Sequence, residues 1–110
     1  MLVHFYIRYS TKPEQSLHIT GNVVELGSNS MINAIELNYV NADFWDVKLE
    51  LNTDKIDILQ YKYILKETGL DDVVEYGDDR CIDLNKYNQR ALTTIDTWQT
   101  EADYRNNFYT

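Results

Sequence analysis

Hydrophobic and polar residues alternate along most of this chain, with the period of two that is typical of half-buried strands. At the start of the chain, Val3, Phe5 and Ile7 take one face while His4 and Tyr6 take the other. The same pattern predicts strands at residues 2–9, 16–20, 45–51, 56–66, 71–76 and 91–98. No window has a helical period with a cap and an end. Strands at intervals of roughly ten residues predict an all-β fold, an antiparallel immunoglobulin-like β-sandwich of about seven strands.

The phase of the alternation also predicts which side chains are buried. Nine residues are expected between the two sheets: Val3, Phe5, Ile7, Ile19, Trp45, Val47, Leu49, Tyr61 and Tyr63. In the 56–66 strand, the polar phase holds Gln60, Lys62, Ile64 and Lys66. Trp45 and Trp98 are both expected in the core rather than on a binding surface, because large aromatic side chains at strand positions are mostly buried.

The length of the chain sets the domain organisation. With 110 residues, 44 % hydrophobic and 25 % charged, the chain has the composition of one ordinary globular domain. Residues 1–99 are assigned to the sandwich. Residues 100–110 lack the alternation, which predicts a linker or the start of a connection to a following domain.

Charge excludes two classes of partner. Eighteen acidic against ten basic residues give a net charge of −8, which repels phosphate backbones and anionic lipid headgroups. We therefore expect neither nucleic acid nor membrane as a partner, and no apolar run approaches the ~20 residues of a membrane span. No basic-then-apolar segment opens the sequence, so we expect no signal segment, and the single cysteine, Cys81, cannot form an internal disulfide. Both features favour a cytoplasmic protein.

A set of short motifs occurs in order between about residue 2 and residue 99. The set comprises Gly21, Glu25-Leu26-Gly27, Asn33-Ala34-Ile35, Trp45, Tyr61-Lys62-Tyr63-Ile64, Glu75, Arg80 and Asp96-Thr97-Trp98. Taken together, these motifs resemble the starch-binding domain of carbohydrate-binding module family 20. The resemblance implies a module without catalytic residues or cofactor, whose ligand is an α-1,4-glucan such as starch, glycogen or a malto-oligosaccharide.

Finer similarity points to the longer protein that would carry such a module. Gln15-Ser16-Leu17 and the segment from Trp98 to Phe108 resemble the first starch-binding module of the disproportionating-enzyme-2 type of 4-α-glucanotransferase, the amylomaltases of glycoside hydrolase family 77. The resemblance implies that the module recruits glucan to a fused glucanotransferase. The following domains of the same polypeptide would then be its partners.

The resemblance also implies where the glucan binds. A glucose ring has an apolar face and a rim of hydroxyls, so its site combines an exposed aromatic ring with directed polar groups. For the first site of the family, the polar residues map to Lys62, Glu75 and Asp79. The two tryptophans that stack on the sugar are replaced by Asn29 and Val74.

Two tyrosines are the candidates to supply the missing aromatic surface. Tyr76 follows Glu75 in the predicted first site. In the predicted second site, Pro13 stands where an aromatic residue is usual, which leaves Tyr39. Binding is therefore expected to be weak, with a Kd on the order of 1 mM. The alternative is a starch-binding fold without sugar affinity that acts as an interdomain or subunit docking module.

Other chemistries have weaker support in the sequence. His4 and His18 lack a third metal ligand. The acidic residues Asp71, Asp72, Asp78, Asp79 and Asp83 do not follow the spacing of a calcium loop. Cys81 has no base beside it in the sequence. We therefore expect no metal site, no cofactor and no catalytic residue in this domain.

Overall fold

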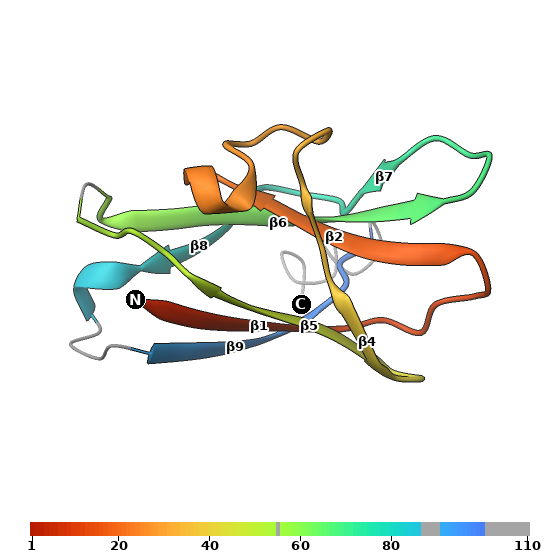
Figure 1. The fold of residues 1–110 in the computed structure, drawn as a ribbon, viewed down its shortest axis with the longest axis horizontal. Coiled ribbons are helices and arrows are strands. Elements are labelled where there is room, and N and C mark those ends of the chain that lie inside the picture. Colours follow the sequence, from red (N-terminus) through yellow and green to blue (C-terminus); the bar gives the residue numbers. More distant parts are fainter. Residues whose placement is uncertain (55, 87–90, 101–110) are drawn as a thin grey trace, which may run out of the picture.

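The computed structural model describes residues 1–54, 56–86 and 91–100. Two sheets pack face to face in a β-sandwich, as predicted (Figure 1). Sheet A has the order β4 (Asn38–Asn41), β5 (Phe44–Glu50), β1 (Leu2–Arg8) and β9 (Ala91–Thr97). Sheet B contains β3 (Ile35–Glu36), β2 (Gln15–Gly21), β6 (Ile58–Glu67), β7 (Val73–Val74) and β8 (Arg80–Asp83). Two short 3-10 segments, η1 (Val24–Leu26) and η2 (Leu84–Lys86), are the only helical turns in the described residues.

The core follows the predicted phase. Eight of the nine predicted residues are buried, including Trp45, which is 8 % exposed. Leu49 is the exception, because it lies near the end of β5 and packs only against the margin of the core. Trp98 is also partly buried against the core, with its ring 5.3 Å from that of Tyr9. Period-two alternation therefore assigned the inward face of these strands correctly.

Ile64 contradicts the predicted phase of β6. It was placed with the polar residues on the outer face of the strand, yet its side chain is fully buried. The reason is tertiary: Ile64 is paired with His18 on β2 and with Val74 on β7, so neighbouring strands flank it on both sides.

The strand count and direction differ from the prediction in three respects. The described residues form nine strands instead of about seven, because β3, β4 and β8 carry no clear alternation; all four residues of β4 are exposed. The predicted strand at residues 71–76 is reduced to Val73–Val74. Finally, β9 pairs with β1 in parallel, although an antiparallel sheet was expected. Alternation has the same period in both directions, so it does not distinguish them.

A loop over residues 22–34 covers part of the outer face of sheet B. Thr20, fully buried on β2, donates its hydroxyl to Leu26 O at 2.7 Å and so holds the loop against the strand. The loop turns at Gly27, which has φ 78 and whose Cβ, if present, would lie 2.3 Å from Asn33 O. Only glycine fits there. The Glu25-Leu26-Gly27 motif thus helps to define the conformation of this loop.

Two expected absences concern the described residues only. No helix there is long and apolar enough to cross a membrane, and no three His, Cys, Asp or Glu side chains gather as metal ligands. His4 lies on sheet A and His18 on sheet B, so they do not share a surface as neighbouring strands would. The proposed boundary at residue 99 remains a prediction, since residues 101–110 lie outside the described part of the chain.

Candidate functional site

The first predicted site lies in a loop between β7 and β8. Val74 pairs with Ile64 and Arg80 pairs with Tyr61, so residues 75–79 form a loop beside Lys62 on β6. We call residues 75–79 together with Lys62 the loop site. Lys62 Nζ lies 3.0 Å from Asp79 Oδ1, and the two side chains are 33 % and 35 % exposed. The structure therefore brings Lys62 and Asp79 together, and their contact with sugar remains a prediction.

Glu75 faces the interior of the protein. Its side chain is 5 % exposed, and its two oxygens accept hydrogen bonds from Arg80 Nε and Nη2, both at 2.8 Å. Gln99 N donates to the same carboxylate at 3.2 Å, and Tyr63 N does so at 3.4 Å. These bonds occupy the carboxylate and favour a structural role. Direct contact between Glu75 and a sugar remains a prediction.

Arg80 connects Glu75 to the last strand of sheet A. Arg80 Nη2 donates to Thr97 O at 2.6 Å, and Nη1 lies 3.5 Å from Asp96 Oδ1. The other oxygen of Asp96 accepts hydrogen bonds from Tyr61 at 2.9 Å and Tyr63 at 2.7 Å. A polar network therefore crosses from sheet B to β9.

Burial and charge keep the two tyrosines and the arginine of this network each in one protonation state. Burial, followed by the nearby charge of Asp96, raises the pKa of both the Tyr61 and Tyr63 hydroxyls. Burial alone would lower the pKa of Arg80, but the hydrogen bonds and charge of Glu75 outweigh it, and the pKa is raised. The tyrosines stay neutral and the arginine stays charged at ordinary pH.

The two positions that carry tryptophan in the resembled family both reach solvent. Asn29 is exposed in the 22–34 loop with φ 64, and Val74 on β7 is 38 % exposed. In Figure 1 this loop and β7 lie on the same outer side of sheet B. Between them, Lys66 Nζ lies 3.4 Å from Met31 O and 3.5 Å from Asp72 Oδ2. A lysine and its partners thus occupy the surface where stacking rings would be expected.

Tyr76 and Tyr39 differ in how much ring they expose. Tyr76 is 41 % exposed, and its backbone N–H donates to Gln99 O at 3.1 Å. Tyr39 on β4 is 60 % exposed, the most of any aromatic side chain in the described residues. Its ring packs perpendicular to Trp45 at 5.5 Å, and Trp45 Nε1 donates to Thr11 Oγ1 in the turn that contains Pro13. Trp45 therefore connects Tyr39 to the segment between β1 and β2, and binding of sugar at Tyr39 remains a prediction.

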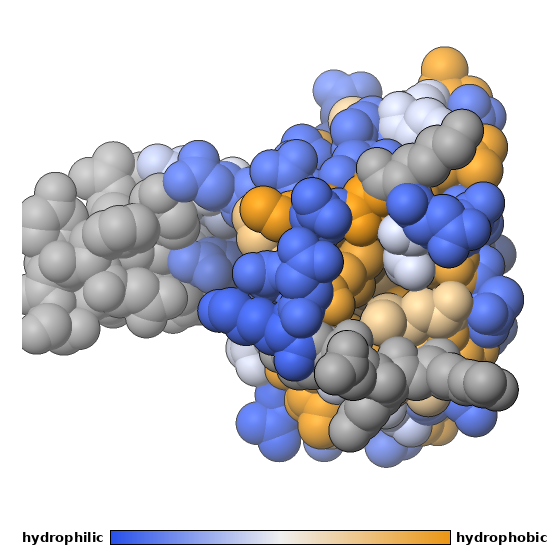
Figure 2. Space-filling model, turned by 90° about the vertical axis from the view of Figure 1, so that its left-hand side faces the viewer, coloured by the Kyte–Doolittle hydropathy of each residue, from blue (hydrophilic) through white to orange (hydrophobic). Residues whose placement is uncertain are grey.

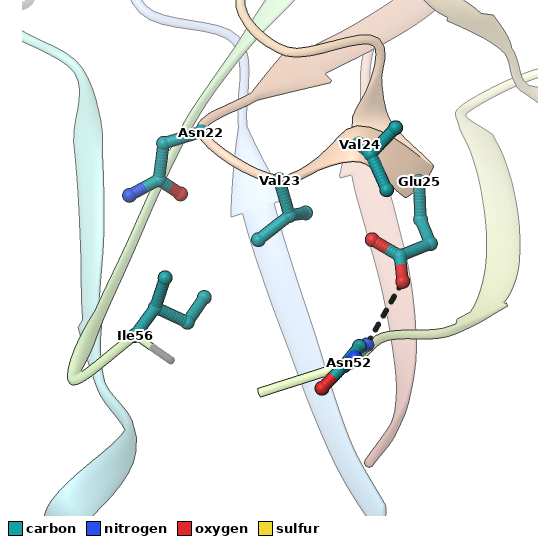
Figure 3. Close-up of a pocket in the computed structure, with 6 residues that line it drawn as sticks. All are labelled: Asn22, Val23, Val24, Glu25, Asn52 and Ile56. Carbon is teal, nitrogen blue, oxygen red and sulfur yellow. Dashed lines mark hydrogen bonds between the residues drawn. The ribbon is translucent and has the colours of Figure 1, made fainter. Parts of the chain in front are cut away.

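A groove of about 210 Å³ lies at the end of the sandwich where β1 begins (Figure 3). We call it the end groove; its lining residues are Asn22, Val23, Val24, Glu25, Asn52 and Ile56. The Asn22 side chain donates a hydrogen bond to Ile58 O and accepts one from Gln60 N, both on β6. Glu25 accepts a hydrogen bond from Asn52 N. Viewed from this end, hydrophobic residues gather around a hollow bordered by polar ones (Figure 2). None of the described residues that line the groove is aromatic, so they offer no stacking surface for sugar.

A second groove, of about 200 Å³, lies on the outer face of sheet A and was not predicted. Tyr6, Val40, Asn41, Phe44 and Ile95 line it. The Tyr6 and Phe44 rings are 6.4 Å apart and perpendicular, and Ile95 is 73 % exposed. The feature of the sequence that could have indicated this groove is Ile95, an isoleucine on the polar phase of the 91–98 strand.

Comparison with known proteins identifies the family of this sandwich. The starch-binding domain family, carbohydrate-binding module family 20, matches residues 1–95. The chain belongs to this family of non-catalytic starch-binding modules. No curated protein matched the chain in a separate comparison.

Solved structures share the fold. The glycoside hydrolase family 15 glucoamylase of Hypocrea jecorina has a TM-score of 0.76 and 24 % identity, covering 90 % of this chain and 17 % of that chain. The γ-CGTase of alkalophilic Bacillus clarkii has a TM-score of 0.72 and 20 % identity, with coverage of 89 % and 15 %. The family 20 module of the maltotetraose-forming amylase of Pseudomonas saccharophila STB07 has a TM-score of 0.70 and 17 % identity, with coverage of 89 % and 100 %. This chain thus spans about a sixth of the two longer enzymes.

Proposed function

We propose that this chain binds α-1,4-glucan mainly through Tyr39, and secondarily at the loop site, and that it recruits glucan to a fused 4-α-glucanotransferase. The observation that carries the proposal is the ring of Tyr39, 60 % exposed yet fixed by its perpendicular contact with Trp45. A tyrosine ring that is already held in place loses little conformational entropy when a ligand stacks on it. Starch, glycogen and malto-oligosaccharides all present the required apolar sugar face.

The loop site supplies polar groups but less aromatic surface. The half-exposed Lys62–Asp79 pair offers one donor and one acceptor to sugar hydroxyls, and Tyr76 offers a partly exposed ring. Asn29 and Val74 provide no ring to stack on. A Kd on the order of 1 mM for each site follows from contacts of this number and kind.

The proposal of a fused glucanotransferase rests on a resemblance to the amylomaltase module, which is carried by the segments Gln15-Ser16-Leu17 and Trp98–Phe108. Two weak sites on one polypeptide raise the affinity for a long polymer through effective concentration. A cytoplasmic location is part of this proposal, and it is supported by the exposed, unbridged thiol of Cys81.

Titration of the ¹⁵N-labelled chain with maltoheptaose, followed by amide shifts, tests the proposal. We expect shifts around Tyr39 and at Lys62, Tyr76 and Asp79. Tyr39→Ala should weaken binding about tenfold, which corresponds to about 1.4 kcal/mol of lost stacking. Tyr39→Phe is the matched control, because it keeps the ring and should bind like the wild type. Equal affinity in Tyr39→Ala and the wild type would contradict the proposed role of this ring.

A docking module without sugar affinity is the second candidate function. The end groove favours it, because Val24 and Ile58 at this end are 78 % and 48 % exposed. Exposed apolar surface of this kind often marks a protein contact. Docking would be favoured over glucan binding if maltoheptaose shifts no amide signal and if Val24 is shielded from solvent in the full-length protein.

A further inference from the structure

The loop site is bonded to the segment that follows β9 as well as to its own sheet. Tyr76 N donates to Gln99 O at 3.1 Å, and Gln99 N donates back to Glu75 Oε2 at 3.2 Å. Arg80 Nη2 donates to Thr97 O at 2.6 Å. These three bonds join the loop to residues 97–99, so the last strand of sheet A helps to set where the loop lies.

Arg80 stands at the centre of these bonds. Its planar guanidinium matches both oxygens of Glu75, and its remaining N–H groups reach Thr97 and Asp96. The guanidinium also lies 5.6 Å from the centroid of the Tyr63 ring. A lysine in this position has one ammonium group and cannot make the same set of bonds.

The loop itself has little regular structure between its two ends. β7 ends at Val74, β8 begins at Arg80, and Gly77 turns the chain with φ 100. Glu75 and Arg80 are therefore the two ends of the loop, and their ion pair closes it. The exposed groups between them, Tyr76 and Asp79, are held in place through that closure.

We propose that Arg80 is the positioning residue of the loop site. Its ion pair with Glu75 holds Tyr76 and Asp79 beside Lys62, and neither Arg80 nor Glu75 touches the glucan. This inference rests on the proposed function. It gives Glu75, which the family resemblance assigns to sugar contact, an indirect role.

The test is a site-resolved titration with maltoheptaose of the double variant Arg80→Met/Glu75→Met. This variant removes both charges of the pair, so Glu75 is not left as a buried charge without its partner, and Asp96 keeps its hydrogen bonds from Tyr61 and Tyr63. We expect the Kd at the loop site, fitted from the amides of residues 62 and 76–79, to rise by at least about tenfold. The Kd at Tyr39, which lies on the other sheet, should stay within about twofold and serves as an internal control.

Two further variants separate positioning from general damage. Arg80→Lys keeps the charge without the planar fork, and it should give an intermediate loss at the loop site only. Arg8→Met removes an arginine that lies 5.5 Å from the Phe44 ring centroid on the outer face of sheet A, and it should change neither site. In the free double variant, amide signals of residues 76–79 should already differ from those of the wild type.

Each contrary result has a separate meaning. An unchanged Kd at the loop site in the double variant would overturn the inference. Equal weakening at both sites would also overturn it, because the pair would then support the whole fold rather than the loop. Shifts at Tyr39 alone in the wild type would overturn the inference and leave the proposed function standing. No shift anywhere in the wild type would overturn the proposed function itself.

Discussion

The two candidate glucan sites of this module are built in opposite ways. At Tyr39 an aromatic ring projects from an exposed edge strand and packs against Trp45. At the loop site the polar groups are present, but Glu75 and Arg80 are only 5 % and 22 % exposed and bond mainly to the protein. The family's polar motif is therefore present here for a reason of folding. Asn29 and Val74, where stacking rings would be expected, are exposed and carry no such constraint.

The largest expected effect is on stability, and it tests whether the Glu75–Arg80 pair of the loop site is part of the fold. Arg80→Met leaves the Glu75 carboxylate buried without its partner, which should cost about 3–5 kcal/mol of unfolding free energy. Urea unfolding followed by tryptophan fluorescence measures this change. Arg8→Met, which loses only an exposed cation–π contact, should cost about 0.5–1 kcal/mol.

The double variant completes this test. Arg80→Met/Glu75→Met should recover part of the loss, because Glu75 is no longer a buried charge without its partner, although Asp96 still loses its contact with Arg80. A single Arg80→Met variant as stable as Arg8→Met would show that the ion pair is not part of the fold.

An intermediate effect is expected from restoring the stacking rings at the loop site. Val74→Trp should tighten maltoheptaose binding about tenfold, or about 1.4 kcal/mol, measured by isothermal calorimetry. Val74 is 38 % exposed, so little stability should be lost. Asn29→Trp should add affinity but cost about 1–2 kcal/mol of stability, since position 29 has φ 64. If both substitutions leave affinity unchanged in a folded protein, these positions do not face the sugar, and docking becomes the better account unless Tyr39→Ala weakens binding.

The smallest effect concerns His18, which lies on β2 and is paired with Ile64 of β6. Burial, and then the charge of Lys66, lowers the pKa of His18 below 6.5, while Glu36 and Asp72 oppose this shift more weakly. The unfolded chain then binds this proton more readily than the folded one. The contribution of His18 to stability is therefore present above about pH 6.5 and is lost as pH falls through the lowered pKa.

Urea unfolding at about pH 7.5 and about pH 5.5 tests this sign. The wild type should lose more stability between the two values than His18→Gln does. His18→Gln lacks the imidazole, so the difference between the two losses reports on the histidine. Parallel losses in the two proteins would show that His18 does not contribute to the pH dependence.

The sequence predicted the central strands well and the edges poorly. Period-two alternation placed β1, β5 and the inward residues of β6, because each of these strands packs one face against the core. It missed β4, whose residues are all exposed, and it misassigned Ile64, which is buried by neighbouring strands on the outer face. Edge strands and outer surfaces depend on what lies beside them, which a local pattern does not contain.

For the candidate site, too, the sequence predicted one part and missed another. The motif order identified the family and named Lys62, Asp79, Tyr76 and Tyr39, and the structure places Lys62 against Asp79 and leaves both tyrosines exposed. The sequence did not reveal that Glu75 points inward, because its partners Arg80, Gln99 and Tyr63 come from three separate segments.

The sequence by itself determined the all-β class, the core and the family, since these follow from local alternation and from motifs in fixed order. The tertiary structure alone decided the parallel pairing of β9, the burial of Ile64 and the division between an exposed ring at Tyr39 and a polar network at Arg80. These depend on contacts between residues far apart in the chain. Burial and hydrogen bonding become defined only when such residues meet.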